Sequence, residues 1–238
     1  MNLRSDFQSR NRLLGALPAS DYSLLHGNLK DVALEQGHVL QDQGGRIQYV
    51  YFPLGGMISL LSVMRDGNAV QTSAVGRDGT VGASFGLGGV HSFSRVVVQI
   101  PGRAARIAGP QFQRTLKESE RLRDLIVRYK EMRLAQAQQS AACNALHGAE
   151  ARLSRWLLQT GDIIDADVVP LTQDYLSQML GVRRTTVTAI ARTLQRAGLI
   201  RYSRGRIEIS DRDKLKKCAC ECYGVLRNHP GHMGRTKR

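Results

Sequence analysis

The stretch from Leu171 to Leu194 constrains the fold more than any other part of the chain, because it predicts two short helices joined by a tight turn. Leu176, Met179 and Leu180 share one face of the first helix, as residues three and four apart do. Gly181 follows where a left-handed residue commonly ends a helix. The pattern therefore predicts a compact helix pair whose first member is buried on one side.

The second helix of the pair has opposite faces of different chemistry. Its apolar side chains repeat at the i, i+3, i+4, i+7 spacing of a buried stripe: Val187, Ile190, Ala191 and Leu194. Its outward face carries Arg184, Thr185, Thr188 and Arg192. A helix that is held by its apolar side and shows Arg and Thr on the other fits the major groove of DNA.

Positive charge is concentrated in the same part of the chain. The net charge is +14, and from Arg183 to the end there are 15 Lys and Arg against 4 Asp and Glu, a net of +11. On a basic surface without a partner, the positive charge would be spread more evenly along the chain. Clustered cations favour a polyanion, because they release counterions when they bind phosphates. The distribution therefore favours a nucleic acid as partner.

The segment from Gly198 to Ile209 predicts a two-stranded hairpin, or wing, directly after the helix pair. A wing beside a helix-turn-helix usually touches backbone phosphate, and Thr172 is a suitable N-cap for the first helix of the pair. We expect the DNA-binding residues to be Thr172, Arg183, Arg184, Thr185, Thr186, Thr188, Arg192, Arg201, Arg204 and Arg206.

The N-terminal half has a different character. Leu3 to Leu29 predicts helices, and short β-rich pieces then alternate with Gly-containing turns from Val32 to Ile107, including a hairpin turn at Asp66-Gly67. Many short strands at regular spacing predict a small antiparallel β-roll, so the fold class is α+β. The expected domains are a β-roll at 1–108, a dimerisation helix at 109–147, a winged helix-turn-helix at 148–217, and a cysteine-containing segment with a basic tail at 218–238.

A long helix is predicted to begin at Gly109 and to carry a heptad seam. The seam residues step by three and four without a break: Leu122, Leu125, Tyr129, Met132, Gln136, Gln139, Cys143 and Leu146. A stripe of this length favours a parallel homodimer, although its beginning would also suit packing on the chain's own β-roll. A further helix is expected over 149–160, followed by a turn-rich segment from Gly161.

The four cysteines, Cys143, Cys218, Cys220 and Cys222, do not suggest a disulfide framework, and Cys218-Ala-Cys220-Glu-Cys222 lacks the CxxC spacing of zinc sites. On one helix Cys218 and Cys222 would share a face, which allows metal or redox chemistry without requiring it, and His229 and His232 in the tail are the other candidate ligands. We expect packed apolar cysteines and no metal. No apolar stretch long enough for a bilayer and no secretory signal is evident, so the expected location is the cytoplasm, on the nucleoid when DNA-bound.

Together, these motifs resemble the Crp/Fnr family of bacterial transcription regulators, most specifically from Leu171 to Thr188 and at Gly198-Leu199-Ile200. The resemblance implies a homodimer that binds a palindromic DNA site and contacts RNA polymerase, without enzymatic activity. It places Arg184 where the family's recognition helix begins with a base-reading Arg. Thr185 and Ala189 stand where other members carry Glu and Arg. The DNA sequence of the operator therefore cannot be inferred from the operators of those members.

The sensory half departs further from the family. The resemblance places the effector-binding region at Gly82, Ala83, Ser94 and Arg95, but the Glu that holds a ribose hydroxyl is missing after Gly82, and Val96 stands where Ser or Thr should follow Arg95. We therefore expect a signal other than cAMP. The absence of cysteine before Gly37 argues against an iron–sulfur cluster there. His26, His38 and His91 could each ligate a haem iron, so haem remains an alternative. No cofactor is predicted, and the effector is unknown.

The alternative function is a small-molecule-binding or metal-dependent β-roll protein with an appended helical domain. Such an enzyme needs clustered His and carboxylates on adjacent strands, and His38 and His91 stand alone in the β region. A non-specific RNA or membrane-surface binder would need aromatic stacking platforms or a basic amphipathic helix, which the pattern does not offer. A DNA-binding regulator remains the leading prediction.

Overall fold

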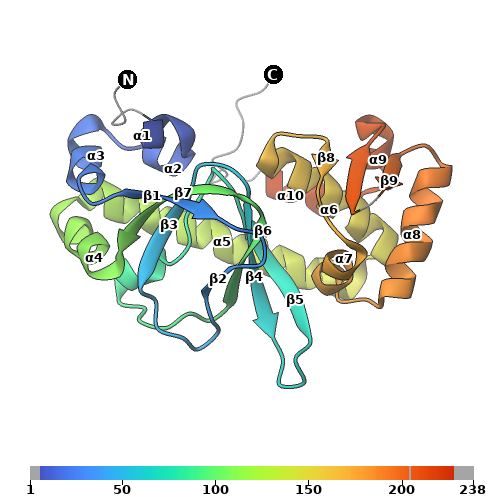
Figure 1. Cartoon of the computed structure of the whole chain (residues 1–238), viewed down its shortest axis with the longest axis horizontal. Helices are drawn as coiled ribbons and strands as arrows, with labels where there is room; N and C mark the ends of the chain where they lie inside the picture. The colour runs from blue at the N-terminus through green and yellow to red at the C-terminus, as the bar shows by residue number, and fades with distance from the viewer. Residues whose placement is uncertain (1–5, 204, 228–238) are drawn as a thin grey trace. The chain divides into compact units, whose positions relative to one another are not determined.

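The computed structural model describes residues 6–203 and 205–227 (Figure 1). Contacts within the chain divide it into two compact units, and each is described by itself below. Of the described residues, 6–62 and 74–134 form the first unit, and 63–73 together with 135–227 form the second, apart from position 204.

The first unit contains short N-terminal helices and the predicted antiparallel strands, except that residues 63–73 of the β4–β5 hairpin are counted with the second unit. The helices are α1 (Asp6–Arg10), α2 (Arg12–Gly15) and α3 (Ala19–His26). One sheet has the order β1 (Lys30–Leu34), β7 (Gly102–Ala108), β3 (Tyr49–Pro53), and the other β2 (Val39–Gln41), β6 (Arg95–Ile100), β4 (Met57–Val63), β5 (Ala69–Val75). The pairs β1–β7, β3–β7, β2–β6 and β4–β6 are antiparallel, which confirms the predicted class of sheet.

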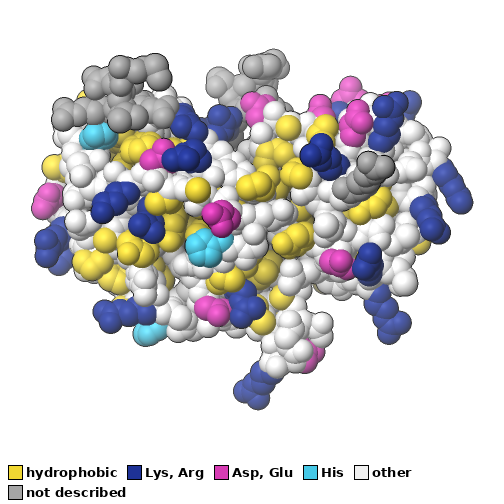
Figure 2. Space-filling view, viewed as in Figure 1, with side chains coloured by type: hydrophobic (Ala, Val, Ile, Leu, Met, Phe, Trp, Pro, Cys, Tyr) yellow, Lys and Arg dark blue, Asp and Glu magenta, His cyan; other side chains and the backbone are white. Residues whose placement is uncertain are grey.

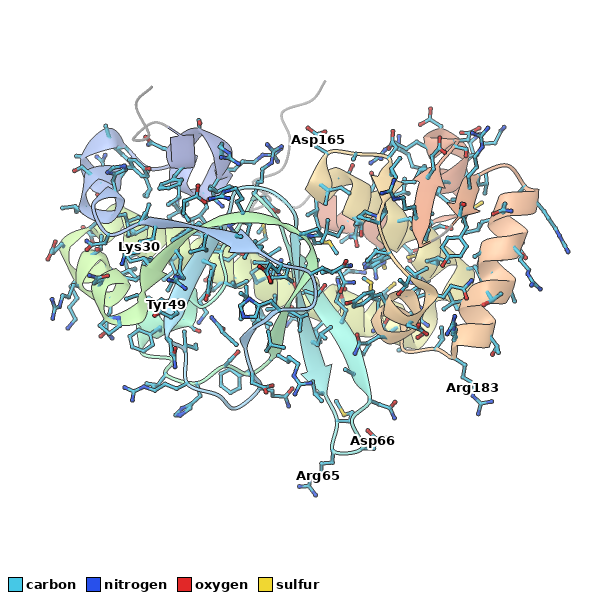
Figure 3. The ribbon with its side chains drawn as sticks, viewed as in Figure 1. Lys30, Tyr49, Arg65, Asp66, Asp165 and Arg183 are labelled. Atoms are coloured by element: carbon cyan, nitrogen blue, oxygen red, sulfur yellow. The ribbon has the colours of Figure 1, made fainter. Side chains whose placement is uncertain are left out.

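The strands enclose an apolar interior. Side chains from several strands and loops form one buried cluster: Leu34, Tyr51, Ile58, Val75, Val81, Val96, Val98 and Ala104. The predicted turn between β4 and β5 is present, with Gly67 at φ 85° and Arg65 and Asp66 at its tip (Figure 3). Burial of this apolar surface is the main stabilising contribution to the roll.

The long helix predicted from Gly109 is interrupted. It consists of α4 (Gly109–Glu118) and α5 (Glu120–Leu146), because Ser119 takes an extended conformation at φ −125° and ψ 105°. The Ser119 hydroxyl caps the new helix by accepting a hydrogen bond from the Leu122 amide over 3.0 Å, and it donates one to Asp21 of α3. A side-chain cap of this kind replaces a partner that the first turn of a helix otherwise lacks.

The predicted seam does not form one exposed stripe along α5. Leu122, Leu125, Tyr129 and Met132 are buried in the core of the first unit, together with side chains from α2, α3 and α4. Of the remaining seam residues, Cys143 is buried, Gln136 and Gln139 are half-buried, and Leu146 is exposed. Internal packing, the alternative considered for the beginning of the seam, therefore accounts for its first four residues.

The second unit carries the predicted helix pair and wing. Its elements are α6 (Ala149–Ile164), β8 (Val168–Val169), α7 (Gln173–Leu180), α8 (Arg184–Arg196), β9 (Ile200–Ser203), β10 (Arg206–Ile209), α9 (Arg212–Cys218) and α10 (Cys222–Arg227). The wing hairpin β9–β10 is joined by β8, which the sequence pattern did not predict, in the order β8-β10-β9.

The predicted basic tail from 228 onwards lies outside the described residues, as do His229 and His232. Within 6–203 and 205–227, no helix combines the length and apolar character that crossing a membrane requires.

Candidate DNA-binding site

Backbone caps fix the ends of the helix pair (Figure 1, orange). Thr172 is the N-cap of α7, and its Oγ1 accepts a hydrogen bond from the Tyr175 amide at 3.4 Å. Gly181 ends α7 in the left-handed region at φ 61°, which glycine adopts without steric cost. Arg183 is the extended N-cap of α8, so that the helix itself begins at Arg184. The predicted capping roles of Thr172 and Gly181 are confirmed.

The buried side of α8 holds it against the rest of the domain. Val187, Ala191 and Leu194 are buried, whereas Ile190 is half-buried. Leu176, Met179 and Leu180 supply the buried face of α7. Apolar packing of this kind fixes which side of α8 remains available to a partner.

The opposite side of α8 presents most of the predicted DNA-binding residues. Arg183, Arg184, Thr185, Thr186 and Arg192 are exposed, and Thr188 is half-buried. The Arg183 side chain extends away from the beginning of α8 (Figure 3). The N-terminal turn of α8 therefore offers guanidinium and hydroxyl groups, which are the donors used to read base edges and to hold phosphates.

Two polar contacts between α7 and α8 were missed by the sequence reading. Asp174 Oδ1 lies 3.1 Å from Arg184 Nη1 in an exposed ion pair. The Thr188 hydroxyl is 2.9 Å from Gln173 Oε1 and 3.0 Å from the carbonyl of Arg184. Gln173 and Asp174 follow Thr172 directly in the first turn of α7. That position was the only sign in the sequence that their side chains could reach α8. Their contacts join the first turn of α7 to the exposed face of α8.

The wing adds cations beside the helix pair. Arg201 and Arg206 are exposed, and Arg204 lies outside the described residues. Arg201 is opposite Glu208 in the β9–β10 register, with Nη1 and Oε2 3.9 Å apart. The Tyr202 amide donates to Gln195 Oε1 of α8 at 3.0 Å, which ties the wing to the helix. Figure 2 shows dark blue Lys and Arg side chains projecting along the side of this domain that carries α8.

The residues expected to bind an effector do not converge on a free cation. Gly82 has φ 82° and is packed against the Tyr49 carbonyl and the Gln41 side chain, while Ala83 is buried. Arg95 is 2.8 Å from Asp42 Oδ1 through its Nε and 3.4 Å from Oδ2 through Nη2. The hydrogen bond from Arg95 holds the pKa of Asp42 below its usual value.

The neighbouring Ser94 takes part only in local contacts, because its amide and carbonyl both lie within hydrogen-bonding distance of the Ser92 hydroxyl.

Comparison with known proteins identifies this architecture. A family model for the Crp-like helix-turn-helix domain matches residues 151–218, from α6 to the end of α9. A solved structure of a transcriptional regulator of the Crp/Fnr family from Eubacterium rectale has a TM-score of 0.69 and 16% identity, and the match covers 87% of this chain and 96% of that one. Residues 151–218 are a Crp-like helix-turn-helix domain, and the chain has the fold of Crp/Fnr-family transcription regulators.

Other solved structures share this fold. FixK2 from Bradyrhizobium japonicum has a TM-score of 0.69 and 14% identity, with 81% of this chain and 98% of that chain covered. The regulator CLP of Xanthomonas campestris, described as responsive to c-di-GMP, has a TM-score of 0.68 and 14% identity, with 82% and 100% covered. No curated protein sequence matches the chain. At these identities, the likeness concerns the fold.

Proposed function

We propose that this regulator binds a palindromic DNA site as a homodimer, with Arg184 reading a guanine in each half-site. The observation that carries the proposal is the exposed Arg and Thr face at the beginning of α8, opposite a fully apolar buried side. Arg184 is the first residue of the helix and its guanidinium is exposed, so it can donate two hydrogen bonds to guanine O6 and N7. Loss of such a pair costs about 1–3 kcal/mol of discrimination.

The supporting residues fall into two groups. Arg183, Arg201 and Arg206 are exposed around the helix and wing, where they suit phosphate contacts that set register without reading sequence. Thr185 and Thr186 are exposed beside Arg184 and are the remaining candidates for base contacts. Because phosphate contacts release counterions, the affinity of the regulator for any duplex should fall steeply with salt.

For the dimer, we propose a face of α5 different from the predicted seam. Val127 and Leu134 remain 40% and 60% exposed, and they are seven residues apart, which places them on the same side of the helix. Exposed large apolar side chains at heptad spacing are what a paired helix would cover. Two recognition helices are needed to reach half-sites about 34 Å apart, so pairing along α5 is required for specific binding.

We also propose that the roll responds to a signal other than cAMP. A cyclic phosphate bound at Arg95 would lie beside the carboxylate of Asp42, which already pairs with that guanidinium and would repel it. Ala83 offers no carboxylate, and the interior of the roll is occupied by the apolar cluster around Ile58, Val96 and Val98. Contact with RNA polymerase stays a prediction.

The deciding experiment is selection of DNA from a random pool, with and without cell extract, followed by gel shifts on the recovered site. Arg184→Ala should abolish preference for that site over random duplex, while Arg128→Ala, which removes an exposed charge from α5, should leave the preference unchanged. Unchanged discrimination in Arg184→Ala would overturn the assignment of Arg184. A recovered motif that differs between the two selections would reveal an effector in the extract.

A further inference from the structure

Three cysteines and one histidine from distant parts of the sequence meet in the second unit. Cys143 and His147 lie one helical turn apart at the end of α5, and Cys220 and Cys222 lie where α9 gives way to α10. One ligand atom from each residue, three sulfurs and a ring nitrogen, can be chosen so that all four are within 4.8 Å of one another. The three thiols are buried and the imidazole is half-buried.

The spacing of these atoms suits a single metal ion. Cys143 Sγ is 3.5 Å from Cys220 Sγ, and Cys222 Sγ is 3.5 Å from His147 Nδ1. Around a tetrahedral zinc ion with Zn–S bonds of ~2.3 Å, two sulfurs are ~3.8 Å apart by simple geometry. A cluster of several irons would hold the sulfurs wider apart, because irons and bridging sulfides would lie between them. The arrangement therefore favours one ion.

The surrounding contacts are those of a metal site with its supporting groups. His147 Nε2 is 3.1 Å from Glu221 Oε1, which fixes the proton on Nε2 and leaves the Nδ1 lone pair directed at the sulfurs. Gln139 Nε2 donates to Cys222 Sγ at 3.0 Å, a contact that favours a thiolate. A carboxylate that orients a ligating histidine is a common feature of zinc sites.

A buried cation lies close by. Arg155 is 8% exposed, and its Nε has no hydrogen-bond partner among the described residues. Arg155 is near enough for its charge to act on the thiols of Cys143 and Cys220. Three thiolates, a neutral imidazole and a divalent ion carry a net charge of −1, which Arg155 would balance.

We propose that Cys143, His147, Cys220 and Cys222 form a Cys₃His site for one zinc-class divalent ion. Binding replaces three S–H protons, which leave to solvent, and uses the Nδ1 lone pair; no electron is transferred. All four positions of the tetrahedron are filled by protein, as in structural rather than catalytic zinc sites. The ion would cross-link the last turn of α5 to the segment after the wing.

The site lies outside the shared DNA-binding module. The Crp-like domain model ends at residue 218 and starts at 151, so none of the four ligands falls within it. The sequence reading expected no metal because it sought CxxC pairs and considered Cys218 and Cys222 on one helix. Ala219 is extended, at ψ 148°, so α9 ends at Cys218 and Cys222 belongs to a different helix. The pair Cys143-x-x-x-His147 was the missed signal.

The test measures metal in the full-length protein, purified without chelator. Elemental analysis should find one zinc per chain, and Co²⁺ added to the metal-free protein should give the visible absorption of a tetrahedral thiolate site. Cys143→Ser and Cys222→Ser should lose at least tenfold in affinity for Co²⁺ and Zn²⁺. Cys218→Ser is the matched control, because its thiol is outside the cluster, and it should bind metal like the unmodified chain.

Thiol counting separates the metal site from a disulfide between Cys143 and Cys220. Denatured, non-reduced protein should show four free thiols once the metal is chelated. Two free thiols with no metal would overturn the proposal in favour of a disulfide. Equal metal affinity in Cys222→Ser and Cys218→Ser would also overturn it, as would a featureless Co²⁺ spectrum in protein whose circular dichroism shows it to be folded.

Discussion

Asp174 of α7 contacts Arg184 of α8 through an ion pair of 3.1 Å between Oδ1 and Nη1. The acidic residue thus lies beside the side chain proposed to read guanine, on a surface that is otherwise rich in cations. Both partners are mostly exposed, so the pair contributes little to stability, about 0.2–1 kcal/mol. We expect its consequence to concern DNA binding, in which the carboxylate would orient Arg184 and repel phosphates.

For Asp174→Asn we therefore expect weaker sequence discrimination together with stronger binding to random duplex, because a negative charge leaves the interface while Arg184 loses its orienting partner. Gel shifts on specific and random DNA at two salt concentrations measure both effects. Asp213→Asn on α9, where Asp213 pairs with Lys216, serves as the charge-matched control. Lower affinity for random duplex in Asp174→Asn would contradict this account.

Removing the Tyr129 hydroxyl should destabilise the first unit. Tyr129 is buried, and its hydroxyl donates to the Thr80 carbonyl at 3.0 Å. Tyr129→Phe leaves that carbonyl without its partner and should lower the free energy of unfolding by about 1–2 kcal/mol. Urea unfolding measures it, with the half-buried Tyr202→Phe as control. A loss as large in the control would show that the hydrogen bond is not the cause.

The same residue predicts a pH dependence. Burial raises the pKa of Tyr129 above 10. The unfolded chain releases the phenolic proton near pH 10, whereas the folded chain keeps it, so the unfolded state binds fewer protons above that pH. The contribution of Tyr129 is therefore complete below pH 10 and declines as pH rises towards the folded-state pKa. The stability difference between the unmodified chain and Tyr129→Phe should shrink over that range, and a constant difference would contradict it.

Leu134→Glu should convert the proposed dimer to a monomer, because it places a charge at the most exposed large apolar residue within the Val127–Leu134 face of α5. Sedimentation velocity reports the mass, and gel shifts should show loss of specific binding with non-specific binding retained. Leu24→Glu changes a residue of 38% exposure on α3 and should leave the mass unchanged. A dimeric Leu134→Glu variant would place the interface elsewhere.

If the metal site is present, a chelator should lower the melting temperature of the regulator, since an ion bound only by the folded chain stabilises it in proportion to RT ln(1 + [L]/Kd). His147→Ala should melt at a lower temperature with zinc present and respond less to chelator. Cys218→Ser should respond like the unmodified chain. Identical responses in His147→Ala and Cys218→Ser would exclude His147 as a ligand.

The sequence predicted the features whose causes are local. The apolar stripe of α8, the cap at Thr172 and the glycine at 181 depend on neighbours within one or two helical turns, and the structure confirms them. The break at Ser119 was missed because it depends on Asp21, 98 positions away. Helix α6 continues past Gly161 to Ile164, where Asp162 pairs with Arg212 of α9, another contact that no local pattern contains.

The candidate sites follow the same division. The exposed face that carries Arg184 was predicted because an amphipathic helix has its own periodicity, whereas the ion pair between Asp174 and Arg184 was missed because it depends on the approach of two helices. The burial of Leu122 and Tyr129 shows the limit of heptad reading, since a stripe packed on its own sheet has the same spacing as a stripe between two chains. The four groups of the proposed metal site are brought together only by folding.

The hydroxyl of Ser119 serves two helices at once, since it donates to Asp21 of α3 and accepts from the amide of Leu122 in α5. The long helix thus starts at a joint, and a bend there leaves the backbone hydrogen bonds beyond Leu122 intact. If α3 moves, the Ser119 hydroxyl can keep its hydrogen bond to Asp21 only if the first turn of α5 moves with α3. Otherwise that turn loses its cap. Leu122 and Leu125 also share a buried core with Tyr22 and Leu25 of α3, so the Ser119 hydroxyl adds a polar link to an apolar one between α3 and the beginning of α5.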